Sequence, residues 1–226
     1  MHRPWPGACP SATGASLARV DASEGRRRFA GHIAGMGSTS GVRVVVGRWL
    51  RTPLGSFADA MVEDAAGRRT LVVPRDDVRE VIAGVYGFDE VVRTPVRVRT
   101  DPVRRTWTLD AGPLQLALTV GERTALGTLL RLVPPAVAAS TAFATAVDPV
   151  ARRVLPGVRT RGVSGGRTEW YGALDQHALV ALDGSWEGVP LGRLADVDPP
   201  VRFGFSSTPR RPSVTRVVTT IGPPHR

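Results

Sequence analysis

The chain has 226 residues, of which 42% are apolar, and its formal net charge is +10. This length suits one domain with a substantial core, and the apolar fraction excludes an intrinsically disordered chain. No run of about 18 apolar residues occurs, so we expect no membrane-spanning helix. The N-terminus also lacks the apolar stretch of a secretory signal, which predicts a cytoplasmic protein.

Cysteine and histidine usage argues against disulfide and metal chemistry. Cys9 is the single cysteine, so it has no partner for an internal disulfide or a cysteine metal cluster. His32 and His177 lie far apart with no spacing typical of metal ligands, and His2 and His225 lie near the two ends. We therefore expect no metal and no cofactor.

The positive charge resides on arginine, because the chain contains no lysine. Arginines concentrate within residues 26–28, 152–167 and 202–216. Net charge informs solubility and non-specific binding before it informs function. A solvated basic surface is the preferred interpretation, and a nucleic-acid-associated protein stays open as an alternative.

Residues 1–27 are rich in Gly, Pro, Ala and Ser and are predicted to form a flexible N-terminal tail. A single domain is expected over residues 28–222, with a short C-terminal tail at 223–226. Short alternating apolar segments predict strands through most of this domain. The predicted strands are 41–49, 57–63, 68–73, 95–100, 104–110, 113–120, 168–174, 178–184, 201–206 and 214–221.

The segment 74–86 changes to a helical period and interrupts the strands. Two aspartates at its start suit the positive end of a helix dipole, and a glycine follows its end. A second, shorter helix is predicted over 124–133, where two prolines end it. The apolar stripe of the first helix consists of Val78, Val81, Ile82 and Val85.

Together these elements predict a mainly β fold. About ten antiparallel strands commonly close into a barrel or a sandwich, since open sheet edges promote aggregation. We expect an antiparallel β-barrel with one or two short helices.

Three short motifs partly match known functional motifs, but the elements predicted around them do not fit those functions. Residues 162–166 match the Gly-x-Ser-x-Gly turn of serine hydrolases, but a strand and not a helix is predicted after them. Gly35, Gly37 and Gly41 miss the dinucleotide-binding spacing and predict a tight turn instead. The stretch 202–205 has the Phe-Gly-Phe of an RNA-recognition strand, but the βαββαβ order is absent.

Two segments of the domain carry a family pattern. Thr52-Pro53-Leu54-Gly55-Ser56-Phe57-Ala58-Asp59 is similar to a Ser-Pro-x-Gly-Pro-Tyr-x-Glu stretch, and residues 76–90 are similar to a helix followed by an aromatic-Gly-Phe-Pro-Lys turn. In these segments the chain resembles the acetoacetate decarboxylase-like superfamily. The resemblance implies a β-barrel with a central small-molecule cavity, into which Asp59 points in the place of the family's acidic residue.

The chain departs from this family at the catalytic lysine. In the decarboxylases that lysine forms a Schiff base with a keto acid, and here Asp89-Glu90 stand in the corresponding turn. Since the chain has no lysine, Schiff-base chemistry by a side chain is excluded. The resemblance then implies a cavity that binds a small organic acid, with any further chemistry left open.

Seven residues are candidates for this site. Asp59 and Glu90 are the candidate catalytic residues, because a buried carboxyl group with a raised pKa can act as an acid or a base. Arg43 alternates with the valines of its strand and is expected to anchor a ligand carboxylate. The other candidate ligand-binding residues are Glu63, Glu169, Tyr171 and His177.

Two further hypotheses come from other classes of protein. The arginine clusters predict a nucleic-acid-associated protein with strongly salt-dependent binding. A β domain that only binds a protein partner, without a reactive cavity, is also compatible with the pattern. Whether the protein is an enzyme stays open, as does its oligomeric state, a homo-oligomer included.

Overall fold

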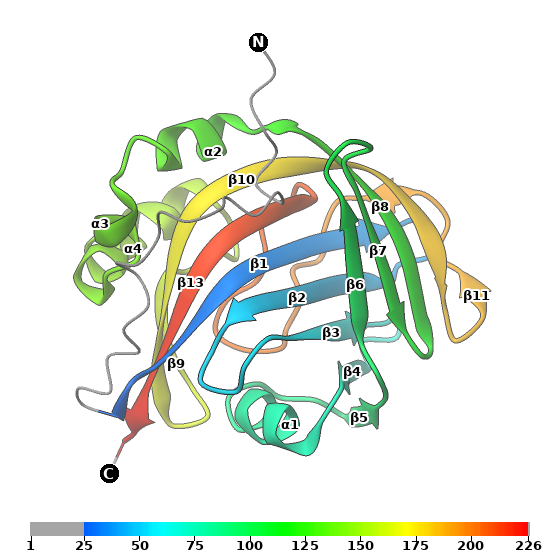
Figure 1. Cartoon of the computed structure of the whole chain (residues 1–226), viewed down its shortest axis with the longest axis horizontal. Coiled ribbons are helices and arrows are strands. Elements are labelled where there is room, and N and C mark those ends of the chain that lie inside the picture. Colours follow the sequence, from blue (N-terminus) through cyan, green and yellow to red (C-terminus); the bar gives the residue numbers. More distant parts are fainter. Residues whose placement is uncertain (1–24, 226) are drawn as a thin grey trace.

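The computed structural model describes residues 25–225, in which strands predominate (Figure 1). The strands are β1 (Arg27–Ser38), β2 (Arg43–Arg51), β3 (Phe57–Glu63), β4 (Arg69–Val73), β5 (Glu90–Arg93), β6 (Arg97–Asp101), β7 (Thr106–Ala111), β8 (Leu114–Arg123), β9 (Arg161–Ser164), β10 (Arg167–Trp186), β11 (Val189–Pro190), β12 (Leu194–Ala195) and β13 (Ser213–Pro224). The helices are α1 (Asp76–Ala83), α2 (Ala125–Leu130), α3 (Pro135–Ala138) and α4 (Thr141–Val154).

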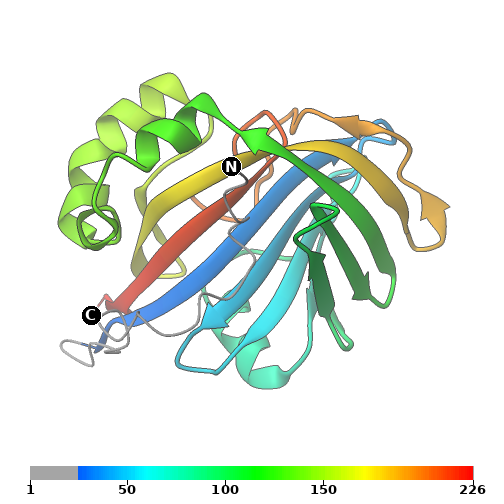
Figure 2. The same ribbon diagram turned by 45° about the horizontal axis from the view of Figure 1, so that its top comes forward.

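The strands form one strongly curled sheet. Its main path runs β5-β4-β3-β2-β1-β13-β10-β8-β7-β6, with β9 and β11 paired to β10 and β12 paired to β1. All pairs are antiparallel except β4 with β5, which are joined through α1 and run parallel. Figures 1 and 2 show that β6, β7 and β8 curl round in front of β1–β3, so the sheet forms a half-barrel.

One face of the sheet carries the main hydrophobic core. Even-numbered residues of β1 and β2, such as Ala34 and Val44, point to this face and meet β7 and β8. Trp107 of β7 packs edge-on against His32, with ring centroids 5.9 Å apart, and closes the core. The inside of the half-barrel is therefore filled with side chains.

The opposite face of the sheet is covered by helices and by the segment 197–209. Phe29, Trp49 and Phe57 pack edge-on or tilted against one another on this face, beside the apolar stripe of α1. Figure 2 shows α2 and α4 over the part of β10 that lies away from β6–β8. This second face holds the candidate site.

The mainly β prediction is confirmed, and so is the helix within 74–86. The shorter helix predicted within 124–133 is present as α2, where Thr124 caps the N-terminus by accepting a hydrogen bond from Gly127 N. The 14 residues of α4 were not predicted, because Pro149 inside the helix indicates a break. Helices are therefore more extensive than the one or two short ones expected.

Three local predictions are wrong in whole or in part. Residues 201–206 form bends and no strand, because Phe203 and Phe205 are held by different partners, Phe88 and Tyr171. Of the three glycines predicted to form a tight turn, Gly35 and Gly37 lie inside β1. Gly41 does lie in the turn between β1 and β2, where its N–H donates to Ser38 O at 3.0 Å. The strands predicted over 168–174 and 178–184 are one strand, β10, whose pairing shifts register near residues 173–175.

The structure describes little of the predicted N-terminal tail and most of the predicted C-terminal tail. Cys9, His2 and most of the predicted N-terminal tail lie outside the described residues. The predicted C-terminal tail begins within β13, and the backbone N–H of His225 donates a hydrogen bond to Gly166 O. Among residues 25–225, no helix has the length and apolar character needed to cross a membrane.

Candidate functional site: an apolar cavity between sheet and helices

A cavity of about 590 Å³ separates the second face of the sheet from its cover. Strands β1, β2, β3, β10 and β13 form its floor, and α1, α2, α4 and the segment 197–209 form its walls. Most of the lining side chains are apolar, and polar side chains lie among them. Small-molecule sites in proteins are commonly of this size and this character, with a few polar groups that orient the ligand.

The cavity reaches the surface between α2 and α4. Leu129, Val150 and Val154 line the cavity and are also 60%, 60% and 68% exposed to solvent. Large apolar side chains with this exposure are costly for a surface that only meets water. The opening is therefore rimmed by apolar groups that suit the entry of an apolar molecule.

Asp59 is the single acidic residue that lines the cavity in the described part of the chain. Its side chain is 1% exposed, and its carboxylate Oδ1 accepts a hydrogen bond from Trp49 Nε1 at 2.8 Å. Burial in apolar surroundings raises the pKa of Asp59 to about 7, and the Trp49 hydrogen bond only partly offsets this. Near neutral pH the group is therefore able to hold a proton and donate a hydrogen bond.

Gly47 makes room for this arrangement on the neighbouring strand. A Cβ atom at position 47 would lie 2.4 Å from Asp59 Oδ1 and 2.5 Å from Trp49 Nε1. Any other residue there would displace one partner of the hydrogen bond. The glycine in the middle of β2 thus positions the one carboxyl group of the cavity.

A second polar cluster lies between β10 and the residues that directly follow α1. The hydroxyl groups of Tyr86 and Tyr171 donate to Glu169 Oε2 at 2.8 Å and 3.0 Å and are in close contact with each other. Both tyrosines line the cavity, and Phe205 stacks on Tyr171. Burial raises the pKa of Glu169 to about 7, against the opposing effect of the two hydroxyl groups.

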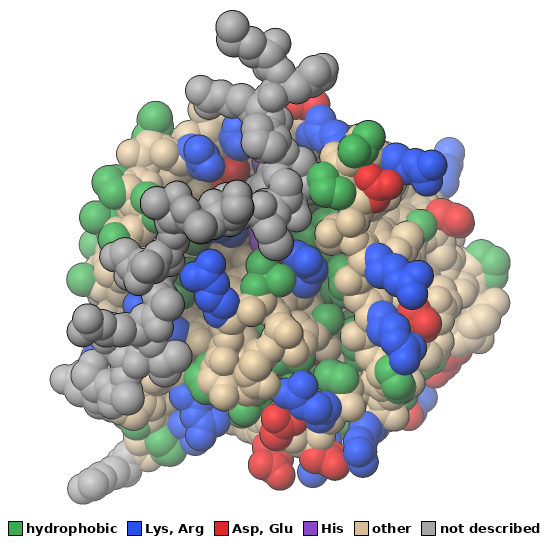
Figure 3. Space-filling view, in the orientation of Figure 1, with side chains coloured by type: hydrophobic (Ala, Val, Ile, Leu, Met, Phe, Trp, Pro, Cys, Tyr) green, Lys and Arg blue, Asp and Glu red, His purple; other side chains and the backbone are tan. Residues whose placement is uncertain are grey.

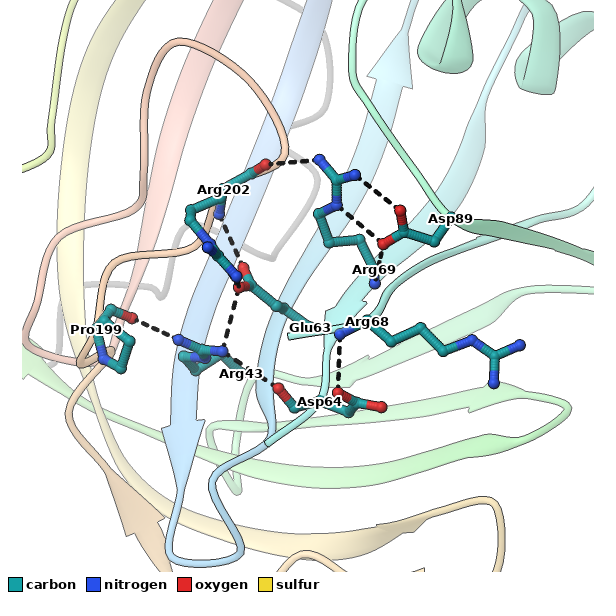
Figure 4. A network of polar contacts seen from close by, with 8 residues as sticks. All are labelled: Arg43, Glu63, Asp64, Arg68, Arg69, Asp89, Pro199 and Arg202. Atoms are coloured by element: carbon teal, nitrogen blue, oxygen red, sulfur yellow. Dashed lines mark hydrogen bonds and ion pairs between the residues drawn. The ribbon is translucent and has the colours of Figure 1, made fainter. Parts of the chain in front are cut away.

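Arg43 and Glu63 form a buried ion pair outside the cavity (Figure 4). The Arg43 guanidinium lies 3.2 Å from Glu63 Oε1 and also donates to the carbonyl oxygens of Asp64 and Pro199. Glu63 additionally accepts from the backbone and side chain of Arg202. This network ties the segment 197–203 to β2 and β3, so both candidates have structural partners.

Glu90 and His177 are placed away from the cavity. Glu90 lies on β5 at the edge of the sheet, where its carboxylate is 2.5 Å from the exposed guanidinium of Arg68. His177 lies on β10 with its Nε2 3.9 Å from Asp175, and burial lowers its pKa. Of the seven predicted residues, the structure places Asp59 and Tyr171 in the cavity wall and Glu169 directly behind it.

Several lining residues were not predicted from the sequence. Tyr86 is the last residue of the helix predicted over 74–86 but follows the observed α1, and only its contact with β10 reveals its role. Arg159, Ser207 and Thr208 lie in segments without periodicity, which offer no signal. The apolar spacing of Phe143, Val147, Val150 and Val154 was the available indication of α4 and of the cavity wall.

The Gly-x-Ser-x-Gly motif lies in a hairpin. Ser164 ends β9 in a hairpin with β10, and its hydroxyl donates to Val85 O in a close contact. It therefore lies on no strand-to-helix turn. Within the part of the chain that the structure describes, no group of three or more His, Cys, Asp or Glu side chains is arranged to bind a metal ion.

The chain has little similarity to known proteins. No family model matches it, and no curated protein matches it. Among solved structures it is similar to a Nitrosomonas europaea protein provisionally named AttH, with 12% identity and a TM-score of 0.26. The match covers 90% of this chain, which spans 40% of the length of that protein. At this TM-score the similarity carries no argument about function.

Proposed function

We propose that the protein binds a largely apolar small molecule in the cavity between the sheet and α2 and α4, without covalent chemistry. The cavity itself is the observation that carries the proposal: about 590 Å³ with a mostly apolar lining. An unfilled apolar space of this size is costly, because the lining atoms lose their packing partners. A ligand that fills the cavity restores those contacts.

Asp59 is the acidic group of this proposed site among the residues that the structure describes. A protonated carboxyl group in apolar surroundings donates a hydrogen bond to a carbonyl or hydroxyl oxygen of the ligand. Tyr86 and Tyr171 also line the cavity, and their hydroxyl groups, which donate to Glu169, add oxygen atoms that are able to accept a hydrogen bond. The site thus offers orientation with few polar contacts, and we propose no reaction.

The resemblance to the acetoacetate decarboxylase-like superfamily supports part of this proposal. Its support is the pair of sequence segments alone. The resemblance implies a cavity inside the barrel, whereas the inside of the half-barrel is filled by the core and Asp59 lines a cavity on the other face of the sheet. The proposed ligand differs from the small organic acid first expected, because Arg43 is bound to Glu63 and the cavity is mostly apolar. An apolar body is therefore the main feature of the ligand.

A fluorescent displacement assay tests the proposal. The neutral probe N-phenyl-1-naphthylamine should brighten on binding to the wild-type protein, and 1-decanol should displace it. In Ala173→Trp a large side chain on β10 fills part of the cavity, so the affinity for the probe should fall at least about tenfold, the equivalent of 1.4 kcal/mol. Ala117→Trp, on the exposed side of β8, is the matched control and should bind the probe as the wild type does. Equal probe binding by both variants would remove the proposal.

A nucleic-acid-associated function has less support. On the face shown in Figure 3, arginine and acidic side chains are interspersed. Many arginines are also paired with carboxylates, such as Arg69 with Asp89 and Arg210 with Asp198. A duplex DNA titration at several salt concentrations tests this alternative, and binding tighter than about 1 μM at physiological salt would favour it.

A further inference from the structure

One end of the cavity contains polar atoms that have no protein partner. Within the described part of the chain, Arg159 Nε, Ser207 Oγ and Thr208 Oγ1 are buried and make no hydrogen bond. All three residues line the cavity. Buried polar atoms are paired in the great majority of cases, so three orphans on one cavity wall require an explanation.

The three residues belong to two segments that are bound to each other. The backbone N–H of Arg159 donates to Ser206 Oγ at 2.9 Å, and Ser207 N donates to Gly157 O at 2.8 Å. These two bonds hold residues 157–159, which connect α4 to β9, against residues 206 and 207. The polar atoms therefore lie on one small region of the wall and not at scattered places.

Backbone packing also fixes Thr208. A Cβ atom at Gly35 would lie 2.4 Å from Thr208 Oγ1 and 2.5 Å from its Cβ, so the threonine side chain lies directly on the bare backbone of β1. Its hydroxyl group is held at the cavity floor without a partner in the protein. Because Gly35 has no side chain, the Thr208 side chain has room to lie against β1.

Charge distinguishes this end of the cavity from the rest. Arg159 is the single cationic side chain in the lining, among the residues that the structure describes. A guanidinium is charged at all relevant pH values, and its planar donors match a carboxylate. The two hydroxyl groups beside it are able to donate to the same oxygen atoms.

From these observations we infer that Arg159, Ser207 and Thr208 form a subsite for the carboxylate of an otherwise apolar ligand, so that the protein binds an amphipathic carboxylic acid. The inference rests on the proposed function, because the apolar tail must occupy the same cavity. None of the three residues was among the seven candidates from the sequence. The carboxylate replaces the missing partners of the three orphan atoms.

Comparing an acid with its alcohol isolates the carboxylate. Displacement of N-phenyl-1-naphthylamine is measured with decanoate and with 1-decanol at pH 6, where decanoate is ionised. The wild-type protein should bind decanoate at least about tenfold more tightly than 1-decanol, since charge-assisted hydrogen bonds are the strong ones. Arg159→Gln should abolish this preference and leave the affinity for 1-decanol unchanged.

Two further variants separate charge from structure. Arg159→Lys keeps the charge and should keep part of the preference for decanoate. Arg161→Gln removes an exposed arginine two residues away, whose backbone N–H is bound to Asp148, and should behave as the wild type. A loss of preference in Arg161→Gln equal to that in Arg159→Gln would point to general surface charge and contradict the subsite.

The outcomes also separate this inference from the proposed function. If 1-decanol binds but decanoate has no advantage, or keeps its advantage in Arg159→Gln, the subsite is refuted and the apolar cavity remains. If neither compound displaces the probe, the proposed function fails and the subsite fails with it.

Discussion

At the scale of single residues, Asp59 shows how the fold changes the chemistry of an ordinary carboxyl group. The same side chain on the surface would be ionised above pH 4, but its place between Trp49 and the apolar floor raises its pKa to about 7. Near neutral pH a sizeable fraction of the protein therefore presents a protonated carboxyl group that donates a hydrogen bond. The sequence indicated the residue, and the surrounding fold determines its protonation.

The raised pKa of Asp59 predicts how stability changes with pH. Because the pKa rises from 3.8 to about 7 on folding, the folded protein keeps a proton that the unfolded chain releases in this window. The free energy of unfolding should therefore fall as the pH rises from about 4 to about 7, by an amount on the order of 4 kcal/mol. Asp59→Asn should remove this contribution.

Urea unfolding of the wild type and of Asp59→Asn at several pH values measures the difference directly. The difference between the two proteins is needed because other groups also change the free energy of unfolding with pH: Glu169 in the same direction as Asp59, and His32 in the opposite direction. Burial lowers the pKa of His32 from 6.5 to about 4, so its contribution to stability grows as the pH rises through that window. A pH-independent difference between the two proteins would contradict the assignment of Asp59.

Glu63 is a residue whose role we predict to be structural. Its carboxylate is fully buried between Arg43 and Arg202. Glu63→Gln would leave the Arg43 charge buried without a counter-charge, so it should lower the free energy of unfolding by about 3 kcal/mol. Arg202→Gln is the matched control: that side chain is 70% exposed, so its removal should cost less than about 1 kcal/mol.

Denaturant midpoints of these two variants decide between a structural and a ligand-binding Glu63. Equal and small losses, combined with weaker binding of decanoate in Glu63→Gln, would indicate a ligand-binding group. The geometry of the ion pair instead predicts a larger loss of stability in Glu63→Gln than in Arg202→Gln. Ligand affinity should stay unchanged in whatever fraction of Glu63→Gln is folded.

At the scale of elements, the segment 197–209 is held without regular secondary structure. Its attachment depends on the Glu63 network at one end and on the contact of Thr208 with β1 at the other. Gly35→Ala would place a methyl group within 2.6 Å of Thr208, so we expect it to lower the free energy of unfolding by about 1–3 kcal/mol.

Gly222→Ala is the comparison for this substitution. The nearest atom to a Cβ there is 3.2 Å away, so the cost should be clearly smaller. Thermal unfolding of both variants gives the difference. An equal effect of the two substitutions would show that the contact between β1 and Thr208 does not hold the segment in place.

Elements with a strong period were predictable from the sequence. The alternation in β2 and β3 and the apolar stripe of α1 are local signals, and the structure has these elements within about three residues of the predicted bounds. The helix α4 was not, since Pro149 conceals a clear apolar stripe. Residues 201–206 failed for the opposite reason: they alternate like a strand, but their phenylalanines pack against separate elements.

The candidate site was predictable only in part, and for a physical reason. Asp59 and Tyr171 lie on strands, where alternation assigns a side chain to one of two faces. Arg43 shares the face of Asp59, but its contact with Glu63 depends on the pairing of β2 with β3. Arg159 and Thr208 meet the cavity through contacts between distant segments, which no local pattern encodes.

At the scale of the whole molecule, the curled sheet serves two purposes with its two faces. One face is filled by the core between β1–β4 and β7–β8, which holds the sheet together. The other face is covered by helices and irregular segments that leave a cavity beneath them. Two smaller buried clusters, one around α1 and one around the segment 197–203, pack on that second face beside the cavity.

Calorimetric titration of 1-octanol into the wild-type protein at several temperatures tests the apolar site most directly. Burial of apolar surface on binding gives a negative change in heat capacity. We predict saturable binding at one site with a negative heat-capacity change, and loss of that binding in Ala173→Trp. Absence of saturable heat, or equal binding by Ala173→Trp, would contradict a ligand in this cavity.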